Sequence, residues 1–433
     1  MSATGRRRVS LRRASVSGGL SGNFWRLWAS AAFANLADGI LFIALTLAAV
    51  RLGASPDDLA WLTIANRAPV TVLGLIAGGL ADRLDRRRTM VAVQLLRVAV
   101  AATLVVLAAT DRLSLLALVA AAGVLGVGEA FFDTNAQAIV PMVAGRERLV
   151  AANGRLFAVE TVMNTFVGPP VGAFLVALSI PVALSGATAG FALAAVGLLL
   201  LTGTFRAAPT VERRHLVSEI AEGVRYLVRH RLLITLPSMV ALGQFGAAAL
   251  FVLLPLYAVA PGPMGLSEPE YGLLFVTFGA GSLVGSFLAG TLVARFGRRP
   301  VLLFATLVFG LGVLVPALSA DFIVVGTALF TVGIAVMAWN VTNVSLRQAA
   351  LPPSMMGRVH ATHRTIAYVA SVIGAAAAGG IGEVAGLRVA FAVGAGFTLL
   401  GLLGGFVVTG RRIAEAEAGE GTRDEPASPL PAR

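Results

Sequence analysis

The chain has 433 residues, of which 57% are hydrophobic and only 13% charged, and its net charge is +12 at neutral pH. A soluble domain has about 25% charged residues, so this composition excludes an ordinary soluble globular protein. All 34 basic residues are arginine. The missing lysine argues against a P-loop of an ATP-driven pump and against Schiff-base chemistry. Cysteine is also absent, which excludes disulfides, thiolate metal sites and cysteine nucleophiles.

The apolar residues come in long blocks of roughly 20, the length that spans a bilayer as a helix. Isolated strands would leave their backbone polar groups unsatisfied in lipid, so these blocks predict helices. Residues 1–23 carry arginines among Ser and Gly and are predicted to be a disordered cytoplasmic arm. The apolar run that follows, 24–50, is too long for a signal-peptide core and is predicted to be the first membrane helix.

Five more helices are expected to complete a first six-helix bundle over 24–205, at residues 59–81, 89–109, 113–140, 154–178 and 181–205. A basic segment, 206–231, is predicted to form an amphipathic helix lying on the cytoplasmic membrane surface as a linker. A second bundle over 232–410 is expected to contain helices at 232–260, 268–294, 300–319, 321–350, 358–384 and 386–410. The acidic, proline-rich tail, 411–433, is predicted to be disordered.

Arginine is concentrated in the loops after the second, fourth, sixth, eighth and tenth predicted helices. Short cytoplasmic loops carry such an excess, because the positive-inside rule sets the orientation of membrane helices. The sequence therefore predicts a multi-pass protein of the cell (inner or plasma) membrane with both termini in the cytoplasm.

Two loops repeat one another in the two halves of the chain. The segment Gly78–Arg88 after the second helix is echoed by Gly290–Pro300 after the eighth. Gln137, Pro141 and Gly168 are likewise echoed, at nearly the same spacing, by Gln348, Pro352 and Gly379. This duplication predicts two pseudo-symmetric six-helix bundles, related by an axis along the membrane normal, in an all-α integral membrane protein of twelve transmembrane helices.

The first of these loops resembles the conserved loop of the major facilitator superfamily, G-x-L-A-D-R-x-G-R-R, with Asp85 in place of the second Gly. The segments Glu147–Gly154 and Gly168–Gly172 are similar to the branch that contains the enterobactin exporter and macrolide efflux proteins. The resemblance implies alternating access driven by an ion gradient, with efflux of drugs or metabolites. One departure is Ala122, which stands where proton-coupled members often have Arg.

The repeated loop also supplies candidate gate residues. Acidic and basic side chains there can pair with one another and with lipid phosphates, and so latch the cytoplasmic ends of the bundles in an outward-facing state. The alternative is that they only set topology, and Ala294 in the second loop makes any latch asymmetric. The predicted cytoplasmic gate comprises Gly78, Asp82, Arg83, Arg86, Arg87 and Arg358.

Small residues and proline in the fifth helix form a predicted bend at Gly168, Pro169 and Gly172. This motif resembles the one found in drug/proton antiporters, so a role in setting the direction of export is a second interpretation beside close packing. Polar and aromatic side chains at membrane depth are candidates for a substrate cavity, with interhelical hydrogen bonding as the alternative. These candidates are Asn35, Phe132, Gln244, Phe245, Trp339, Asn340 and Asn343.

Four carboxylates lie within predicted helices of the first bundle: Asp38, Glu129, Asp133 and Glu160. An unpaired carboxylate in the bilayer is costly and can exchange a proton in each transport cycle, so all four are candidates for proton coupling. Glu129 and Asp133 are four residues apart on one helical face and could share a proton. The alternative is a structural ion pair with Arg97 or Arg67.

The sequence thus predicts a secondary transporter that exports a drug-like or secondary-metabolite small molecule in exchange for protons. No nucleophile–base or metal-ligand constellation stands out, so no enzymatic activity, metal, cofactor or nucleic-acid binding is expected. The expected partners are substrate, protons and membrane lipids, and the expected state is a monomer. Two alternatives remain open: an importer or lipid or nutrient transporter of the same fold, and a non-transporting membrane sensor.

Overall fold

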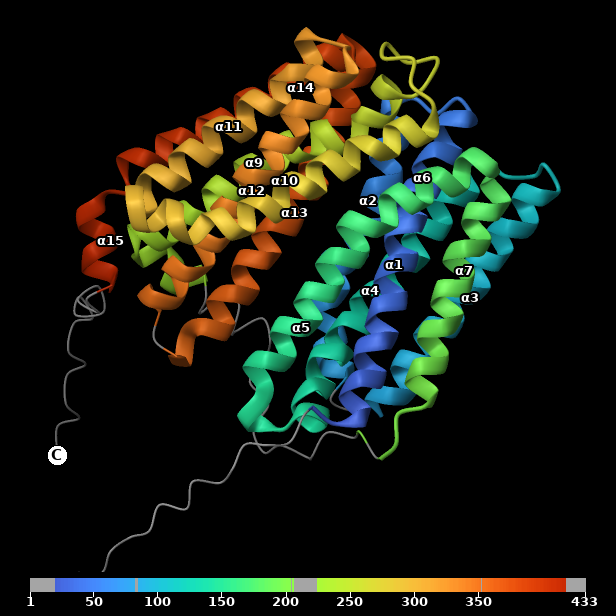
Figure 1. Ribbon diagram of the computed structural model, residues 1–433, viewed down its shortest axis with the longest axis horizontal. Coiled ribbons are helices and arrows are strands. Elements are labelled where there is room, and N and C mark those ends of the chain that lie inside the picture. The colour runs from blue at the N-terminus through green and yellow to red at the C-terminus, as the bar shows by residue number, and fades with distance from the viewer. Residues whose placement is uncertain (1–19, 82–84, 204, 206–223, 352, 418–433) are drawn as a thin grey trace, which may run out of the picture.

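A computed structural model of the protein describes residues 20–81, 85–203, 205, 224–351 and 353–417. These residues are almost entirely helical, and the helices form two bundles that lean against each other (Figure 1). The division falls between residues 205 and 224, so each bundle is one continuous half of the chain.

The N-terminal bundle contains α1 (Gly22–Arg51), α2 (Pro56–Ala81), α3 (Arg86–Ala109), α4 (Leu115–Ala144), the 3-10 turn η1 (Arg146–Arg148), α5 (Leu149–Thr161), η2 (Val162–Val167), α6 (Gly168–Leu178) and α7 (Ile180–Leu199). The π-helix η2 joins α5 to α6, so these three elements form one membrane span.

The C-terminal bundle contains α9 (Arg231–Ala258), α10 (Glu268–Phe296), α11 (Arg298–Leu318), α12 (Phe322–Ala350), α13 (Pro353–Ala385), α14 (Leu387–Leu400) with the 3-10 helix η3 (Gly401–Phe406), and α15 (Gly410–Glu417). Helices α14 and η3 together form the last span.

In the described part of the chain, eleven helical spans are long and apolar enough to cross a membrane. The 26-residue α2, which packs on α4 and α13, is the twelfth long helix. The predicted all-α membrane fold is therefore confirmed. Polar caps fix where several spans begin, because each cap accepts a hydrogen bond from a first-turn backbone N–H. These caps are Ser21, Ser114, Ser179 and Asp321.

Three segments differ from their predicted structure or lie outside the described residues. The tail predicted to be disordered begins with α15, in which buried Ile413 packs beside Leu232 and Val408 and Arg411 pairs with Glu415. The arm predicted over 1–23 ends in the first turn of α1, and its first 19 residues are not described. In the predicted linker, 224–229 are helical and 206–223 lie outside the described residues.

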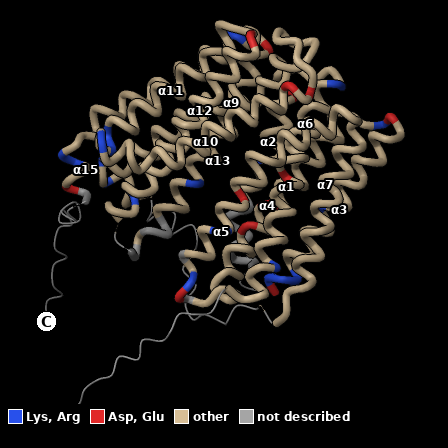
Figure 2. The backbone as a smooth tube through the Cα atoms, viewed as in Figure 1, with Lys and Arg blue, Asp and Glu red and all other residues tan. Residues whose placement is uncertain are grey.

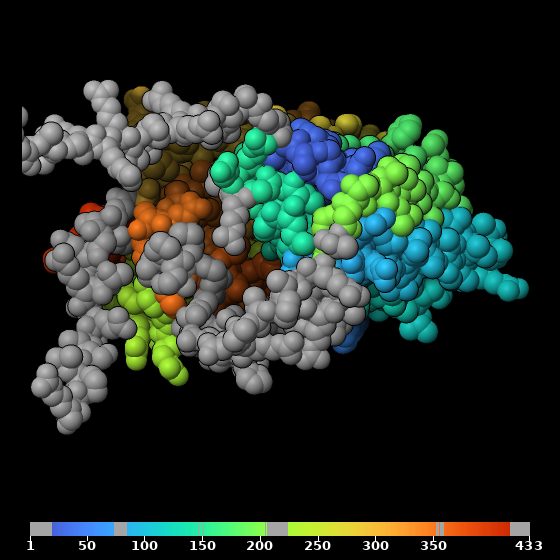
Figure 3. Space-filling model, turned by 90° about the horizontal axis from the view of Figure 1, so that it is seen from below, coloured from blue at the N-terminus to red at the C-terminus, as the bar shows by residue number. Residues whose placement is uncertain are grey.

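Charged residues distinguish the two ends of the bundles (Figure 2). We call one the basic end; it carries Arg86–Arg88, Arg231, Arg295–Arg299 and Arg411–Arg412. At the opposite end lie the acidic residues of the α1–α2, α9–α10 and α11–α12 connections. Figure 3 views the molecule from the basic end, with the two bundles on separate sides of the face.

The bundles are held together at the opposite end. Arg51 at the end of α1 makes a 2.7 Å ion pair with Glu268 at the start of α10. Gly382 of α13 lies against Pro56 of α2, where an added Cβ would come within 3.0 Å of the proline Cβ. Helix α6 of the N-terminal bundle also packs against α10 of the C-terminal bundle. Toward the basic end, α5 and α13 diverge (Figure 1).

The bend in the fifth span brings α1 and α6 very close together. A Cβ on Gly39 would lie 2.8 Å from the Cα of Gly168 and 2.7 Å from the Asn164 carbonyl oxygen, so only glycine fits there. Pro169 and Pro170 lack the backbone N–H groups that would donate hydrogen bonds to the carbonyls of the preceding α-helical turn. The preceding turn is the π-helix η2, a local rearrangement often found at functional sites.

Candidate functional site

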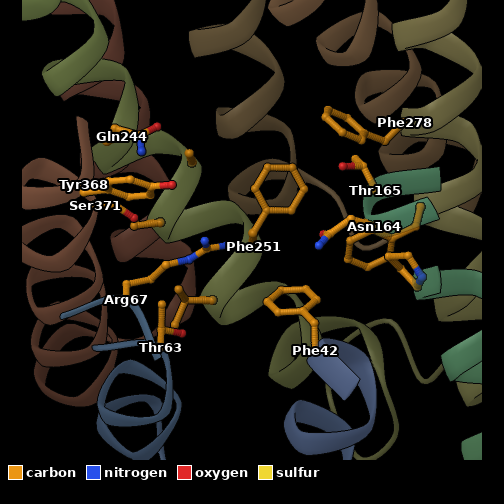
Figure 4. A pocket seen from close by; sticks show the side chains of 15 residues that line it. Phe42, Thr63, Arg67, Asn164, Thr165, Gln244, Phe251, Phe278, Tyr368 and Ser371 are labelled. Carbon is orange, nitrogen blue, oxygen red and sulfur yellow. The ribbon is translucent and has the colours of Figure 1, made fainter. Parts of the chain in front are cut away.

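A cavity of about 360 Å³ lies between the two bundles (Figure 4). Its walls come from α1, α2, η2 and α6 on one side and from α9, α10 and α13 on the other. The lining residues are Phe42, Thr63, Arg67, Asn164, Thr165, Pro169, Gln244, Ala247, Ala248, Phe251, Val252, Phe275, Phe278, Tyr368 and Ser371.

Aromatic rings form much of this lining. The rings of Phe251 and Phe278 meet edge to face at 5.3 Å, and Phe42 of α1 meets Phe275 of α10 at 6.5 Å across the bundle boundary. The polar side chains lie on two sides of the cavity: Gln244, Tyr368, Ser371 and Arg67 on one, and Asn164 and Thr165 on the other (Figure 4). A cavity that combines aromatic rings with polar groups is suited to an amphipathic small molecule.

A smaller cavity of about 90 Å³ continues from the first into the N-terminal bundle. The two share Phe42, Thr63, Arg67 and Asn164 as lining residues. The smaller one ends at Asp38 and Glu129, so two of the predicted coupling carboxylates line a space that adjoins the central cavity.

Glu129 of α4 faces Arg67 of α2 at 3.8 Å. This ion pair is long and partly open, with the Arg67 side chain 37% exposed and the Glu129 side chain 22% exposed. A pair in such a setting is weakly held, because solvent screens it and its geometry is poor.

Asp38 of α1 is held more firmly, at 3.2 Å from the guanidinium of Arg97 on α3. The Arg97 side chain is 1% exposed and lies over the ring of Phe191 at 5.1 Å. Gly128 of α4 packs against it, and a Cβ there would lie 3.0 Å from the arginine Nε. The buried arginine thus has one carboxylate partner, and removing that partner would leave an uncompensated charge in the bundle.

The other two predicted coupling carboxylates, Asp133 and Glu160, lie close enough to these groups to interact with them electrostatically. Asp133 lies within electrostatic reach of Glu129, Glu160, Arg97 and Asp38, and Glu160 within reach of Glu129 and of Arg364 on α13. Asp133 and Glu160 form no ion pair with a side chain in the described part of the chain. The structure therefore brings the four carboxylates into one network, in which two have arginine partners.

Gln244 is the predicted cavity residue that the structure places in the lining, where its amide donates to the Ala367 carbonyl at 3.3 Å. The other six are not among the described side chains that line the two cavities. Phe132 lies beside Arg97, Asn35 donates to Ala31 in its own helix, and Phe245 stacks on Phe397. The remaining three, Trp339, Asn340 and Asn343, lie on α12 away from the lining residues.

These departures have a physical cause. A polar or aromatic side chain within a bundle can face a neighbouring helix or its own backbone as well as a cavity. The sequence pattern alone does not distinguish these faces. The position of a residue along a membrane helix therefore does not predict whether its side chain lines the cavity.

A family profile described as "Transmembrane secretion effector" matches residues 19–430, nearly the whole chain. The chain belongs to this family. Its members are transporters of the major facilitator superfamily, and the predicted superfamily and efflux branch are confirmed. Members of this superfamily are not enzymes. Within the described residues no group of three His, Asp or Glu side chains could hold a metal ion.

The chain is 27% identical to the "Multidrug efflux pump Tap" of Mycolicibacterium fortuitum, over 86% of this chain and 93% of that protein. It is 22% identical to "Macrolide efflux protein A" of Streptococcus pyogenes, over 81% and 87% of the two chains. Among solved structures, a bacterial homologue of the iron transporter ferroportin superposes with a TM-score of 0.70 and 15% identity, covering 89% of this chain and 98% of that one. This last likeness concerns the fold.

The loop that carries the family resemblance is partly described. Gly78 lies in α2, Asp82 and Arg83 fall outside the described residues, and nothing is described of the Arg358 side chain in α13. Arg86 donates to the Ala138 carbonyl at 2.9 Å and Arg87 to the Leu198 carbonyl at 3.0 Å. Both partners belong to the N-terminal bundle, so these arginines bind helix ends of their own bundle in this conformation.

Sequence analysis gave Arg67 only as a possible structural partner, and it did not single out Asn164, Thr165, Tyr368 or the aromatic wall. A signal existed for Arg67, because a charged residue far inside an apolar helix is usually functional. Asn164 and Thr165 carried the weaker signal of polar side chains within an apolar helix. Their position depends on the π-helix.

We predict that Asp38→Asn will destabilise the protein strongly, by about 3–5 kcal/mol, because it leaves buried Arg97 without its carboxylate. The double change Asp38→Asn with Arg97→Gln should recover most of the loss, since it removes both charges. Thermal unfolding of the purified protein, followed together with the monodisperse yield, measures this.

The matched comparison is Glu129→Gln, which removes a carboxylate from the longer, more open pair and should cost much less. If Asp38→Asn alone is as stable as the wild type, or if the double variant is no better than the single one, the structural role of the pair is wrong.

Proposed function

We propose that this transporter is a proton-coupled exporter of drug-like or secondary-metabolite small molecules that works by alternating access. The observation that carries the proposal is the junction of the two cavities: an aromatic cavity between the bundles adjoins a smaller one that ends at Asp38 and Glu129. A site for an amphipathic substrate thus lies beside groups that can bind protons.

The substrate side of the proposal rests on the larger cavity. Its volume of about 360 Å³ is in the range that holds a drug-sized ligand. Phe42, Phe251, Phe275 and Phe278 offer ring faces and edges for stacking, while Arg67 and Gln244 can orient polar groups of the ligand. The family relatives named as multidrug and macrolide efflux proteins support the same class of substrate.

The proton side rests on the charge balance of the N-terminal bundle. Four carboxylates, Asp38, Glu129, Asp133 and Glu160, lie in one network, and the two arginines paired with them balance only half of that charge. Unbalanced carboxylates at membrane depth are favoured to bind protons, because the bilayer stabilises charge poorly. We assign exchange chiefly to Glu129 and Asp133, since Asp38 is tied to buried Arg97.

Alternating access is supported by the arrangement of the bundles. They are joined at the opposite end by Arg51 and Glu268 and diverge toward the basic end. If the basic end is cytoplasmic, as the arginine distribution predicts, this conformation is inward-facing. Closing the basic end would then bring Glu160 toward Arg364 on α13 and open the Arg51–Glu268 pair. The predicted latch at Asp82, Arg83, Arg86 and Arg87 would act in that closed state.

The orientation predicts that a reporter active only in the cytoplasm works when fused after α15, and that one active only in the periplasm works between α1 and α2. Measuring both fusions in cells checks this. A periplasmic reporter that is active on the tail would contradict the orientation and, with it, the inward-facing assignment.

The function predicts uphill accumulation of a substrate dye or drug by everted membrane vesicles when a proton gradient is imposed, because these vesicles expose the cytoplasmic side. Glu129→Gln and Asp133→Asn should lower this uphill accumulation at least tenfold. They should leave downhill exchange of the same compound nearly intact, since neither side chain lines the larger, substrate-binding cavity.

The matched control is Glu147→Gln, an exposed change between α4 and α5, which should transport normally. Three results would count against the proposal. The first is net efflux from everted vesicles, which would indicate an importer. The second is the absence of any transport in a broad compound panel. The third is full uphill transport by the variant that lacks both carboxylates.

A further inference from the structure

A second, larger cavity lies on the outside of the C-terminal bundle, away from the central site. Its volume is about 570 Å³, and it is formed by the end of α10, the start of α11 and the middle of α12. Helices α10 and α11 both pack along α12 but touch each other little, which leaves a groove between them. The lining residues are Leu292, Phe296, Pro300, Val301, Phe304, Ala305, Val308, Thr331, Ile334, Ala335 and Ala338.

This groove is suited to hydrocarbon. Thr331 is the one lining residue with a polar side chain, and its hydroxyl donates to the Ala328 carbonyl of its own helix at 2.8 Å. Phe296 is 57% exposed and Phe304 is 68% exposed, so the groove opens at the surface of the bundle. In a membrane-spanning bundle that surface meets lipid, and an acyl chain can enter from the side.

Positive charge stands at the mouth of the groove. The Arg295 guanidinium lies 5.8 Å from the ring centroid of Phe296, which itself lines the groove. Arg299 follows at the start of α11 and donates to the Gly405 carbonyl of η3 at 3.2 Å, and η3 contributes no lining residue to the groove in the described part of the chain. Both lie at the basic end, where the groove is nearest the membrane surface. A phosphate bound there would meet charge on the side from which an acyl chain would enter.

We propose that this groove is a binding site for an anionic phospholipid, with an acyl chain between α10 and α11 and the headgroup phosphate at Arg295. The site gives a role to the second copy of the repeated loop, Gly290–Pro300, which lacks the acidic residue of the first copy at Ala294. Without that carboxylate, the exposed Arg295 stands beside the groove with no acidic side chain at position 294. The inference does not rest on the transported substrate or on proton coupling.

The test compares phosphatidylglycerol with phosphatidylcholine of identical acyl chains. Delipidated protein is titrated with each lipid in detergent, and bound lipid is counted by native mass spectrometry. The wild type should bind phosphatidylglycerol with clear preference. Arg295→Gln should weaken that binding about fivefold, the loss expected for one arginine near an anionic headgroup. Val308→Trp, which fills the groove, should abolish the preference.

Two matched variants serve as controls. Arg388→Gln removes an exposed arginine at the start of α14, at the opposite end, and Leu193→Trp adds an indole to an exposed position of α7. Both should bind lipid like the wild type. The comparison of Arg295→Gln with the wild type does not depend on whether Val308→Trp folds. Arg295 is exposed, and Arg295→Gln leaves the groove lining intact.

Equal binding of the two lipids by the wild type would overturn the proposal, as would equal losses in Arg295→Gln and Arg388→Gln. Inorganic phosphate is the remaining probe. If phosphate alone stabilises the protein against heating as much as phosphatidylglycerol does, the acyl chain plays no part and the groove is not a lipid site.

Discussion

A bilayer stabilises buried charge poorly, and this constraint organises the N-terminal bundle. Asp38 and Arg97 meet inside it at 3.2 Å, with the arginine shielded by Phe191 and fitted against Gly128. The cost of a central helical charge in a membrane is about 2.5–3.5 kcal/mol, so each must be paired, protonated or next to water. The pair accounts for one carboxylate and leaves the others in the network to be balanced by Arg67 or by protons.

The two bundles contribute differently to the central cavity. The N-terminal bundle supplies charge and the π-helix that carries Asn164 and Thr165, while the C-terminal bundle supplies Phe251, Phe275 and Phe278. The sequence duplication therefore gives a shared fold without shared chemistry. In the proposed mechanism the proton-binding groups lie on the N-terminal wall and three of the four aromatic rings on the C-terminal wall, so a movement of one bundle against the other would change both environments together.

Much of the fold could be predicted from the sequence, because each span must be long and apolar to cross the bilayer. Prediction was weaker where a contact between distant segments decides the structure. The tail after residue 410 looked disordered from its charge, yet Ile413 anchors α15 to the C-terminal bundle. The predicted carboxylates lie together because they share one bundle. Of the seven predicted cavity residues, Gln244 is the one found among the described residues that line the two cavities, since hydropathy gives depth and not the direction a side chain faces.

The central claim is that substrate and protons compete through the carboxylates of the N-terminal bundle. Its most direct test is proton release when the purified wild-type protein, in weakly buffered detergent solution with a pH indicator, binds a compound that it transports. Linkage requires that a ligand favouring the deprotonated site displaces protons. The account predicts release of about one proton per bound molecule, lost in the Glu129→Gln, Asp133→Asn double variant. Binding that releases no proton at any pH, with an affinity independent of pH, would contradict it.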